Sequence, residues 1–294
     1  MSASTSVSRS EGHFYSRSSE LFYQSWVNPI ARATLVLTHG MGEHSEAYIK
    51  SAADLARLGW NVIAWDLRGH GRSAGKRGHV AHFSDFSNDL SQFLLYLKKS
   101  GKLDQPFVLV GHSMGGLITL KYLIDETKDG ASDDPKPVAC VLSSPLLGVA
   151  LAVPQLKELA GRVLSSVWPS LTLHNEIDYA DLTRDPEWLK TYDRDSLRHD
   201  KISAALYAGM VDTMKSVLDH ADAVRLPIQV LAAGNDKIVS LDAEKALFER
   251  LGSSNKKMII YKDSYHEIFN DLERETVFRD LNEFLRALPG LENL

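Results

Sequence analysis

Short apolar runs alternate with amphipathic stretches along most of the chain, and few folds accommodate this alternation. The runs are rich in Val, Ile and Leu at successive positions, which indicates strands that are buried on both faces. The expected strands cover residues 21–27, 33–37, 61–65, 106–110, 138–142, 228–232 and 258–261. Such strands must be covered by helices on both sides, so we predict an α/β fold with a mostly parallel sheet. The first run, 21–27, is expected to be an antiparallel edge strand.

Apolar residues at helical spacing predict the helices that flank this sheet. One stripe runs from Phe83 to Leu97, and another runs from Val277 to Leu288. A third helix is expected over residues 241–251, because Ser240 is a good N-cap residue and Gly252 follows the last turn.

The interval 145–226 departs from this alternation of strands and helices, because it contains helical patterns without a buried strand between them. One apolar stripe runs from Leu156 to Trp168 and another from Ile202 to Leu218. We expect both stripes to pack on the main domain, and a role in lining the substrate site or contacting a membrane stays open. The predicted organisation is a Ser-rich disordered tail at 1–10, a core at 11–144 and 227–294, and a helical cap insertion at 145–226.

Composition excludes several classes of protein. The 33 Lys and Arg residues against 38 Asp and Glu residues give a net charge of −5, so no global positive field attracts nucleic acid. The single cysteine, Cys140, allows no internal disulfide, and no paired Cys/His spacing indicates a metal site. We therefore expect no metal and no cofactor. The first residues lack an apolar signal region and no run is long enough to span a bilayer, so we expect a cytoplasmic protein.

A candidate nucleophile lies in the motif Gly111-His112-Ser113-Met114-Gly115, which directly follows the strand 106–110 and opens a helical pattern. This strand, turn and helix context is typical of a nucleophile elbow, in which a strained turn exposes the serine hydroxyl. The motif predicts Ser113 as the nucleophile.

A serine nucleophile needs a base, and the base needs an orienting carboxylate. Asp236 follows the strand 228–232 and His266 follows the strand 258–261. Carboxyl ends of parallel strands share one edge of a sheet, so we expect Ser113, Asp236 and His266 to meet there. The Gly- and Arg-rich turn 66–73 is expected to be structural.

The reaction also needs backbone N–H groups that bind the developing oxyanion. Met114 follows the nucleophile and supplies the first candidate N–H group. The segment 38–43 follows the strand 33–37 and contains two glycines, so the Met41 N–H is the second candidate.

Several strings resemble the monoacylglycerol lipase and lysophospholipase group of the α/β-hydrolase superfamily. They are His39-Gly-Met-Gly-Glu-His-Ser45, Asp66-Leu-Arg-Gly-His-Gly-Arg-Ser73, Arg77-Gly-His-Val80 and Gly111-His-Ser-Met-Gly-Gly116, together with Asp236 and His266. The resemblance covers about residues 30–145 and 225–290. It implies an α/β-hydrolase fold whose cap covers an acyl-binding tunnel, and a monoacylglycerol or lysophospholipid substrate. The family commonly has an arginine immediately before Tyr48, where this chain has Ala47.

The sequence thus predicts a serine carboxylester hydrolase that cleaves a fatty acyl ester through an acyl-enzyme. Two alternatives stay open. One is an aminopeptidase or amidase on the same scaffold, for which Glu176 and Asp178 could bind the substrate amine. The other is a non-catalytic ligand-binding protein. Peripheral membrane contact through the cap is a further option, and the sequence assigns no oligomeric state.

Overall fold

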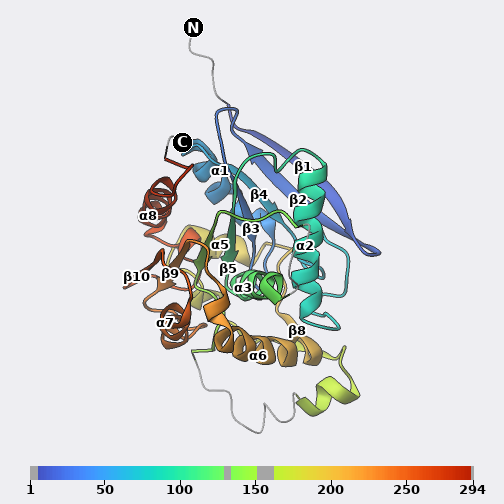
Figure 1. The fold of residues 1–294 in the computed structure, drawn as a ribbon. Helices are drawn as coiled ribbons and strands as arrows, with labels where there is room; N and C mark the ends of the chain where they lie inside the picture. Colours follow the sequence, from blue (N-terminus) through green and yellow to red (C-terminus); the bar gives the residue numbers. More distant parts are fainter. Residues whose placement is uncertain (1–5, 129–133, 151–161, 293–294) are drawn as a thin grey trace.

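A computed structural model of the chain describes residues 6–128, 134–150 and 162–292. Eight strands form one sheet in the order β1-β2-β4-β3-β5-β6-β9-β10 (Figure 1). They are β1 (Ser8–Ser16), β2 (Ser19–Val27), β3 (Thr34–Thr38), β4 (Asn61–Trp65), β5 (Phe107–His112), β6 (Ala139–Ser143), β9 (Ile228–Ala233) and β10 (Lys256–Tyr261). Neighbouring strands from β4 to β10 are all parallel, whereas β2 is antiparallel to both β4 and β1. The predicted mostly parallel α/β fold is confirmed.

The N-terminal hairpin of β1 and β2 corrects two expectations. β2 is antiparallel as predicted, but it is not an edge strand because β1 pairs along its whole length. The predicted disordered tail of residues 1–10 extends too far, because residues 8–10 belong to β1, while residues 1–5 lie outside the described residues. Most of β1 is exposed and polar, so it lacks the alternating apolar pattern that reveals a half-buried strand.

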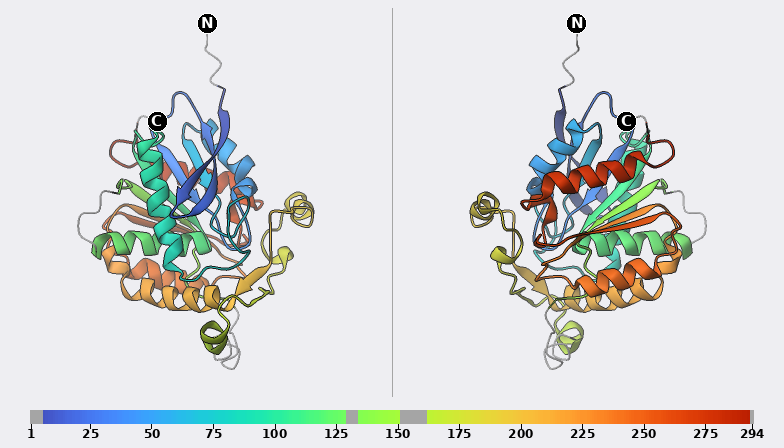
Figure 2. Two further views of the ribbon diagram at one scale, coloured as in Figure 1. Left: turned by 90° about the vertical axis from the view of Figure 1, so that its right-hand side faces the viewer. Right: turned by 90° about the vertical axis from the view of Figure 1, so that its left-hand side faces the viewer.

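Helices cover both faces of the sheet (Figure 2). α1 (Ile49–Arg57) and α8 (Arg274–Arg286) cover one face. The other face is covered by α2 (Ser84–Lys99), α3 (Met114–Lys128), α6 (Ala204–Asp219) and α7 (Leu241–Arg250). Along β5, Leu109 packs with the second group, while Val108 and Val110 pack with the first. This alternation explains why β5 is apolar at successive positions.

The two apolar stripes of the predicted insertion behave differently. In α6, Leu206, Met210 and Val217 are buried in the same cluster as α2 and α3, so the packing predicted for this stripe is confirmed. Residues 151–161 of the other stripe lie outside the described residues, and residues 162–167 are helical. Val167 and Trp168 are 77% and 59% exposed, which contradicts the expectation that this part packs on the core.

The rest of the insertion projects away from the layers (Figure 2). It consists of short elements, namely β7 (Thr172–His174), η2 (Tyr179–Asp181), α5 (Pro186–Tyr192) and β8 (Lys201–Ser203), with β7 and β8 paired as a small antiparallel ladder. Three further 3₁₀ turns are η1 (Ser45–Tyr48), η3 (Ala221–Ala223) and η4 (Ile268–Asn270). None of the helices in the described ranges is long and apolar enough to cross a membrane.

Candidate active site

Ser113 occupies the turn between β5 and α3, and its backbone has a φ of 51°. This left-handed conformation is strained for a residue with a side chain. The turn is held by hydrogen bonds from Ser113 N–H to Ser143 O (3.0 Å) and from Leu146 N–H to Ser113 O (3.0 Å). Gly115 allows α3 to approach β3, because a Cβ there would lie 2.1 Å from the Thr38 carbonyl oxygen. The predicted elbow geometry is therefore present.

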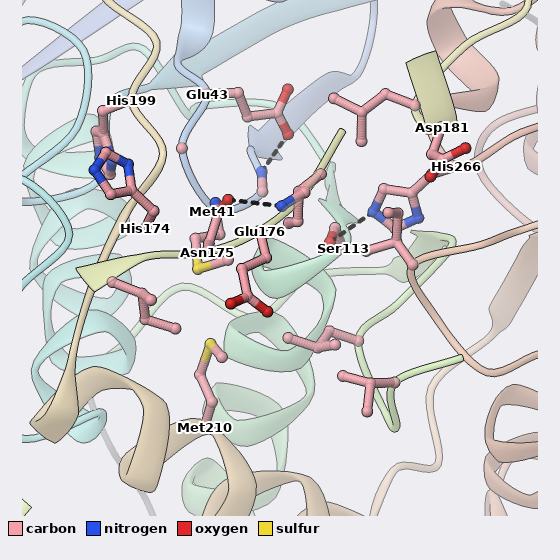
Figure 3. A pocket seen from close by; sticks show the side chains of 18 of the residues that line it. Met41, Glu43, Ser113, His174, Asn175, Glu176, Asp181, His199, Met210 and His266 are labelled. Atoms are coloured by element: carbon pink, nitrogen blue, oxygen red, sulfur yellow. Dashed lines mark hydrogen bonds between the residues drawn. The ribbon is translucent and has the colours of Figure 1, made fainter. Parts of the chain in front are cut away.

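The structure brings Ser113, His266 and Asp236 together at the carboxyl ends of β5, β10 and β9. The Ser113 hydroxyl lies 2.9 Å from His266 Nε2, and His266 Nδ1 lies 2.7 Å from Asp236 Oδ2 (Figure 3 shows the first pair). The Ile238 and Val239 N–H groups donate to Asp236 Oδ1 at 2.8 and 2.9 Å. These contacts require an Nδ1–H on His266 and leave Nε2 free to accept the Ser113 proton.

The same contacts determine the protonation states of His266 and Asp236. Burial alone would lower the pKa of His266, but the Asp236 carboxylate and its hydrogen bond raise that pKa above its usual value. Burial would raise the pKa of Asp236, yet His266 and the two backbone amides lower it. Asp236 therefore stays ionised. Its negative charge stabilises the protonated form of His266, which is produced when His266 accepts the proton of the Ser113 hydroxyl.

The loop after β3 lies directly against Ser113. A Cβ added to Gly40 would lie only 3.0 Å from Ser113 Cβ, and Met41 lines the cavity beside Ser113 (Figure 3). Met114 is the first residue of α3, where backbone N–H groups have no acceptor within the helix. Both predicted donors thus lie on the segments next to Ser113.

A cavity of about 550 Å³ opens at Ser113 and His266. Its lining is largely apolar and includes Leu146, Leu164, Leu173, Ile202, Met210 and Ile238. Glu176 and Asp178, the residues proposed for binding an amine, also line it, and Glu176 has a φ of 59°. Most of the lining comes from the insertion, so this segment provides the walls of the site.

A buried charged cluster that forms part of the cavity wall was not predicted from the sequence. It consists of Glu43, Arg198 and Glu267, whose side chains are 3%, 4% and 4% exposed. Burial and the nearby Glu267 raise the pKa of Glu43 to about 7. Burial opposes ionisation of Glu267 as well, but Arg198 and the hydrogen bonds from Tyr192 and Asn270 lower its pKa to about 2. Glu43 lies inside the His39–Ser45 string and Glu267 follows His266, whereas no pattern marks Arg198.

The other candidate groups do not contact the Ser113 hydroxyl. His112 is buried and its Nδ1 lies 3.1 Å from Ser143 O, while burial lowers its pKa to about 3. Cys140 is buried in β6, and burial raises its pKa. Asp66 accepts the N–H groups of Ser45 and Arg72, both at 2.7 Å, as expected of a structural turn. Within the described ranges, no cluster of His, Cys, Asp or Glu has the arrangement of a metal site.

Comparison with known proteins gives consistent matches. A family model described as serine aminopeptidase, S33 matches residues 29–273. Phospholipase YtpA of Bacillus subtilis is 30% identical over 86% of this chain and 94% of that protein. The crystal structure of the monoacylglycerol lipase of Paleococcus ferrophilus has a TM-score of 0.79 and 32% identity, covering 90% of this chain and 97% of that chain. An uncharacterized abhydrolase domain-containing protein of Dictyostelium discoideum is 30% identical over 88% of this chain, which spans 27% of that longer protein.

Proposed function

Because the chain belongs to the serine aminopeptidase S33 family of α/β hydrolases, we propose that it is a serine carboxylester hydrolase acting on fatty acyl esters. The observation that carries this proposal is the hydrogen-bonded series Asp236, His266 and Ser113 at the mouth of a largely apolar cavity. The hydroxyl and imidazole lie within the reach that proton transfer needs.

The reaction proceeds in two steps on this geometry. Ser113 Oγ attacks the acyl carbonyl carbon while His266 Nε2 accepts the hydroxyl proton, and His266 then donates this proton to the leaving alkoxide. The alcohol departs and an acyl-enzyme remains. Water next attacks the same carbonyl, His266 accepts a proton from it and returns one to Ser113 Oγ, and the fatty acid is released. The Met41 and Met114 N–H groups bind the oxyanion of each tetrahedral intermediate.

Monoacylglycerols and lysophospholipids are the proposed substrates. Two relatives support this choice, because their names describe a monoacylglycerol lipase and a phospholipase. The apolar lining of the cavity supports it as well, because one fatty chain can be buried there at a gain of about 0.8 kcal/mol per methylene group.

The first experiment measures hydrolysis of short p-nitrophenyl esters by the purified protein. Ser113→Ala should lower the rate at least about 10³-fold while circular dichroism stays unchanged. A panel of monoacylglycerols and lysophospholipids of graded chain length then identifies the substrate. Unchanged turnover by Ser113→Ala would refute the assignment, and tight lipid binding without cleavage of any ester would favour a non-catalytic role.

A second candidate activity is hydrolysis of an aminoacyl bond. The carboxylates of Glu176 and Asp178 line the cavity, where they could bind a substrate amine, and the matching family model is described as a serine aminopeptidase. Aminoacyl p-nitroanilides and monoacyl esters compared on the same preparation distinguish the two activities. Faster cleavage of the anilides would favour the aminopeptidase.

The insertion is also the proposed site of contact with a lipid surface. Val163, Val167, Trp168 and Leu173 are all more than half exposed, and Leu173 continues into the cavity lining. Exposed apolar side chains beside an apolar cavity can enter a lipid interface and bring the chain of a substrate to Ser113.

A further inference from the structure

One arginine of the insertion contacts carboxylates on two separate segments of the site. Arg198 lies between α5 and β8, and its Nη1 and Nη2 atoms lie 3.1 and 3.3 Å from the two carboxylate oxygens of Glu267. The same Nη2 lies 4.0 Å from Glu43 Oε2. The Tyr192 ring packs 3.8 Å from the guanidinium carbon, which further fixes the side chain.

Glu43 is hydrogen-bonded to the segment that carries Met41. Its Oε1 accepts the Gly40 N–H at 2.5 Å and the Tyr48 hydroxyl at 2.9 Å. The Gly40 peptide adjoins Met41, so the position of the Glu43 carboxylate sets the path of the loop beside Ser113. Residues 39–48 contain no Lys or Arg, so the guanidinium that faces Glu43 is supplied by the insertion.

Glu267 is linked through the backbone to His266, the general base. It follows His266 directly, and its Oε2 accepts hydrogen bonds from the Tyr192 hydroxyl and, at 3.0 Å, from Asn270 Nδ2. Its backbone N–H donates to Leu182 O at 2.8 Å. A displacement of the Glu267 side chain therefore acts on the backbone that holds the His266 imidazole.

We propose that Arg198 is a positioning residue that, by bridging Glu43 and Glu267, holds the Met41 loop and His266 in the relative placement that the reaction needs. The kinetic part of this inference rests on the proposed esterase function. The structural part rests on the contacts alone.

Electrostatics explains why the bridge matters. Buried carboxylates that lie near each other repel, and the Arg198 guanidinium offsets this repulsion because it faces both Glu43 and Glu267. The burial of Glu43 and its proximity to Glu267 already raise the Glu43 pKa to about 7. Without Arg198, the link between the Glu43 and Glu267 carboxylates is lost, so the Met41 loop and the His266 segment lose their fixed relative placement.

The central variant is Arg198→Met, which keeps an unbranched apolar stem and removes the guanidinium. p-Nitrophenyl butyrate is the substrate, because it lacks a glycerol or phosphate head group that Arg198 could contact directly. We expect kcat to fall about 10- to 100-fold, as for a small displacement of reacting groups. KM should change by less than about threefold, because the apolar residues that line the cavity, such as Leu146 and Ile202, are retained.

A matched control separates this effect from general loss of an ion pair. Arg68 binds Asp89 through Nε and Nη2, both at 2.5 Å, and does not line the cavity. Arg68→Met should lower the melting temperature without changing kcat.

A double variant separates positioning from a merely structural role. Arg198→Met leaves Glu267 as an unpaired buried charge, and Arg198→Met/Glu267→Gln removes that charge, so the melting temperature should recover. Positioning predicts that kcat stays low in the double variant. Recovery of kcat together with the melting temperature would overturn the proposal, as would a normal kcat in Arg198→Met.

A spectroscopic readout tests the placement without turnover. The His266 Nδ1 proton that bonds to Asp236 should give a low-field proton resonance, assigned by its loss in Asp236→Asn. Arg198→Met should shift or broaden this resonance, whereas Arg68→Met should not. If the wild-type protein cleaves no ester, the proposed function fails, and an unchanged resonance in Arg198→Met would still refute the positioning role.

Discussion

His266 donates its Nδ1–H to Asp236 at 2.7 Å, and the carboxylate that accepts it is fixed by two backbone amides on its other oxygen. The imidazole is therefore held in one tautomer and one orientation. Both the rate of the reaction and its dependence on pH should follow from this single hydrogen bond.

Asp236→Asn should lower kcat about 10⁴-fold, because an amide cannot hold His266 in the required tautomer. The Asp236 carboxylate raises the pKa of His266, so its removal lowers that pKa and leaves the base neutral down to lower pH. The acid limb of the pH profile of kcat/KM should therefore move to lower pH.

The exposed Asp242, on the neighbouring helix α7, provides the control for this prediction. Asp242→Asn should leave both the rate and the acid limb unchanged. An acid limb that stays in place in Asp236→Asn would mean that another group sets it.

Ser113→Gly should be more stable than Ser113→Ala by about 1 kcal/mol. The φ of 51° at this position strains any residue with a Cβ, and glycine adopts it freely. Both variants lack the nucleophile, so urea unfolding compares their stabilities without the influence of substrate. Equal unfolding midpoints would show that the elbow stores no such strain.

Stability should fall as the pH drops below about 6.5. Burial lowers the pKa of His39 and His112 to about 3 and that of His199 to about 4. These groups bind protons more weakly in the folded chain than in the unfolded chain, so the stability is present near pH 7 and is lost as the pH falls toward the folded values. Each group that is neutral only when folded contributes about 1.4 kcal/mol per pH unit in that window.

Glu43, Glu244 and His266 act in the opposite sense, because their raised pKa values make the folded chain bind a proton more tightly. His70 adds to the loss from the three histidines, because burial lowers its pKa as well, so the net slope should keep its sign but be smaller than the histidines alone would give. Urea unfolding at pH 7, 6, 5 and 4 measures it. A constant free energy of unfolding between pH 7 and pH 5 would contradict the prediction.

Val167→Ser/Trp168→Ser should weaken binding to lipid vesicles about tenfold, because two apolar side chains would no longer enter the interface. Sedimentation with vesicles measures binding, and turnover of a water-soluble ester reports correct folding. Leu272→Ser is the control, because Leu272 is 60% exposed but lies outside the insertion. If Val167→Ser/Trp168→Ser and Leu272→Ser lose vesicle binding to the same extent, the insertion is not a specific contact surface.

The parallel core and the placement of Ser113, Asp236 and His266 could be predicted because each depends on local pattern. Strands buried on both faces are apolar throughout, and the order of parallel strands brings the residues that follow them to one edge. β1 could not be predicted in this way, because an exposed outer strand of Ser8–Ser16 has no apolar period.

The charged cluster illustrates the other limit. The contact between Arg198 and Glu267 joins residues that are 69 positions apart, and neither side chain belongs to a periodic pattern. Such a pair depends on where a projecting segment folds back onto the core. Only the three-dimensional arrangement reveals it.

The pairing of β6 with β9 joins the part of the chain before the insertion to the part after it. Ser113 and Met41 belong to the first part, whereas Asp236 and His266 belong to the second. During synthesis, the first part leaves the ribosome with a nucleophile that has no base. Because His266 follows β10, the chain can become reactive toward esters only after β9 has paired with β6 and β10 has paired with β9, and a chain that ends before His266 lacks the base altogether.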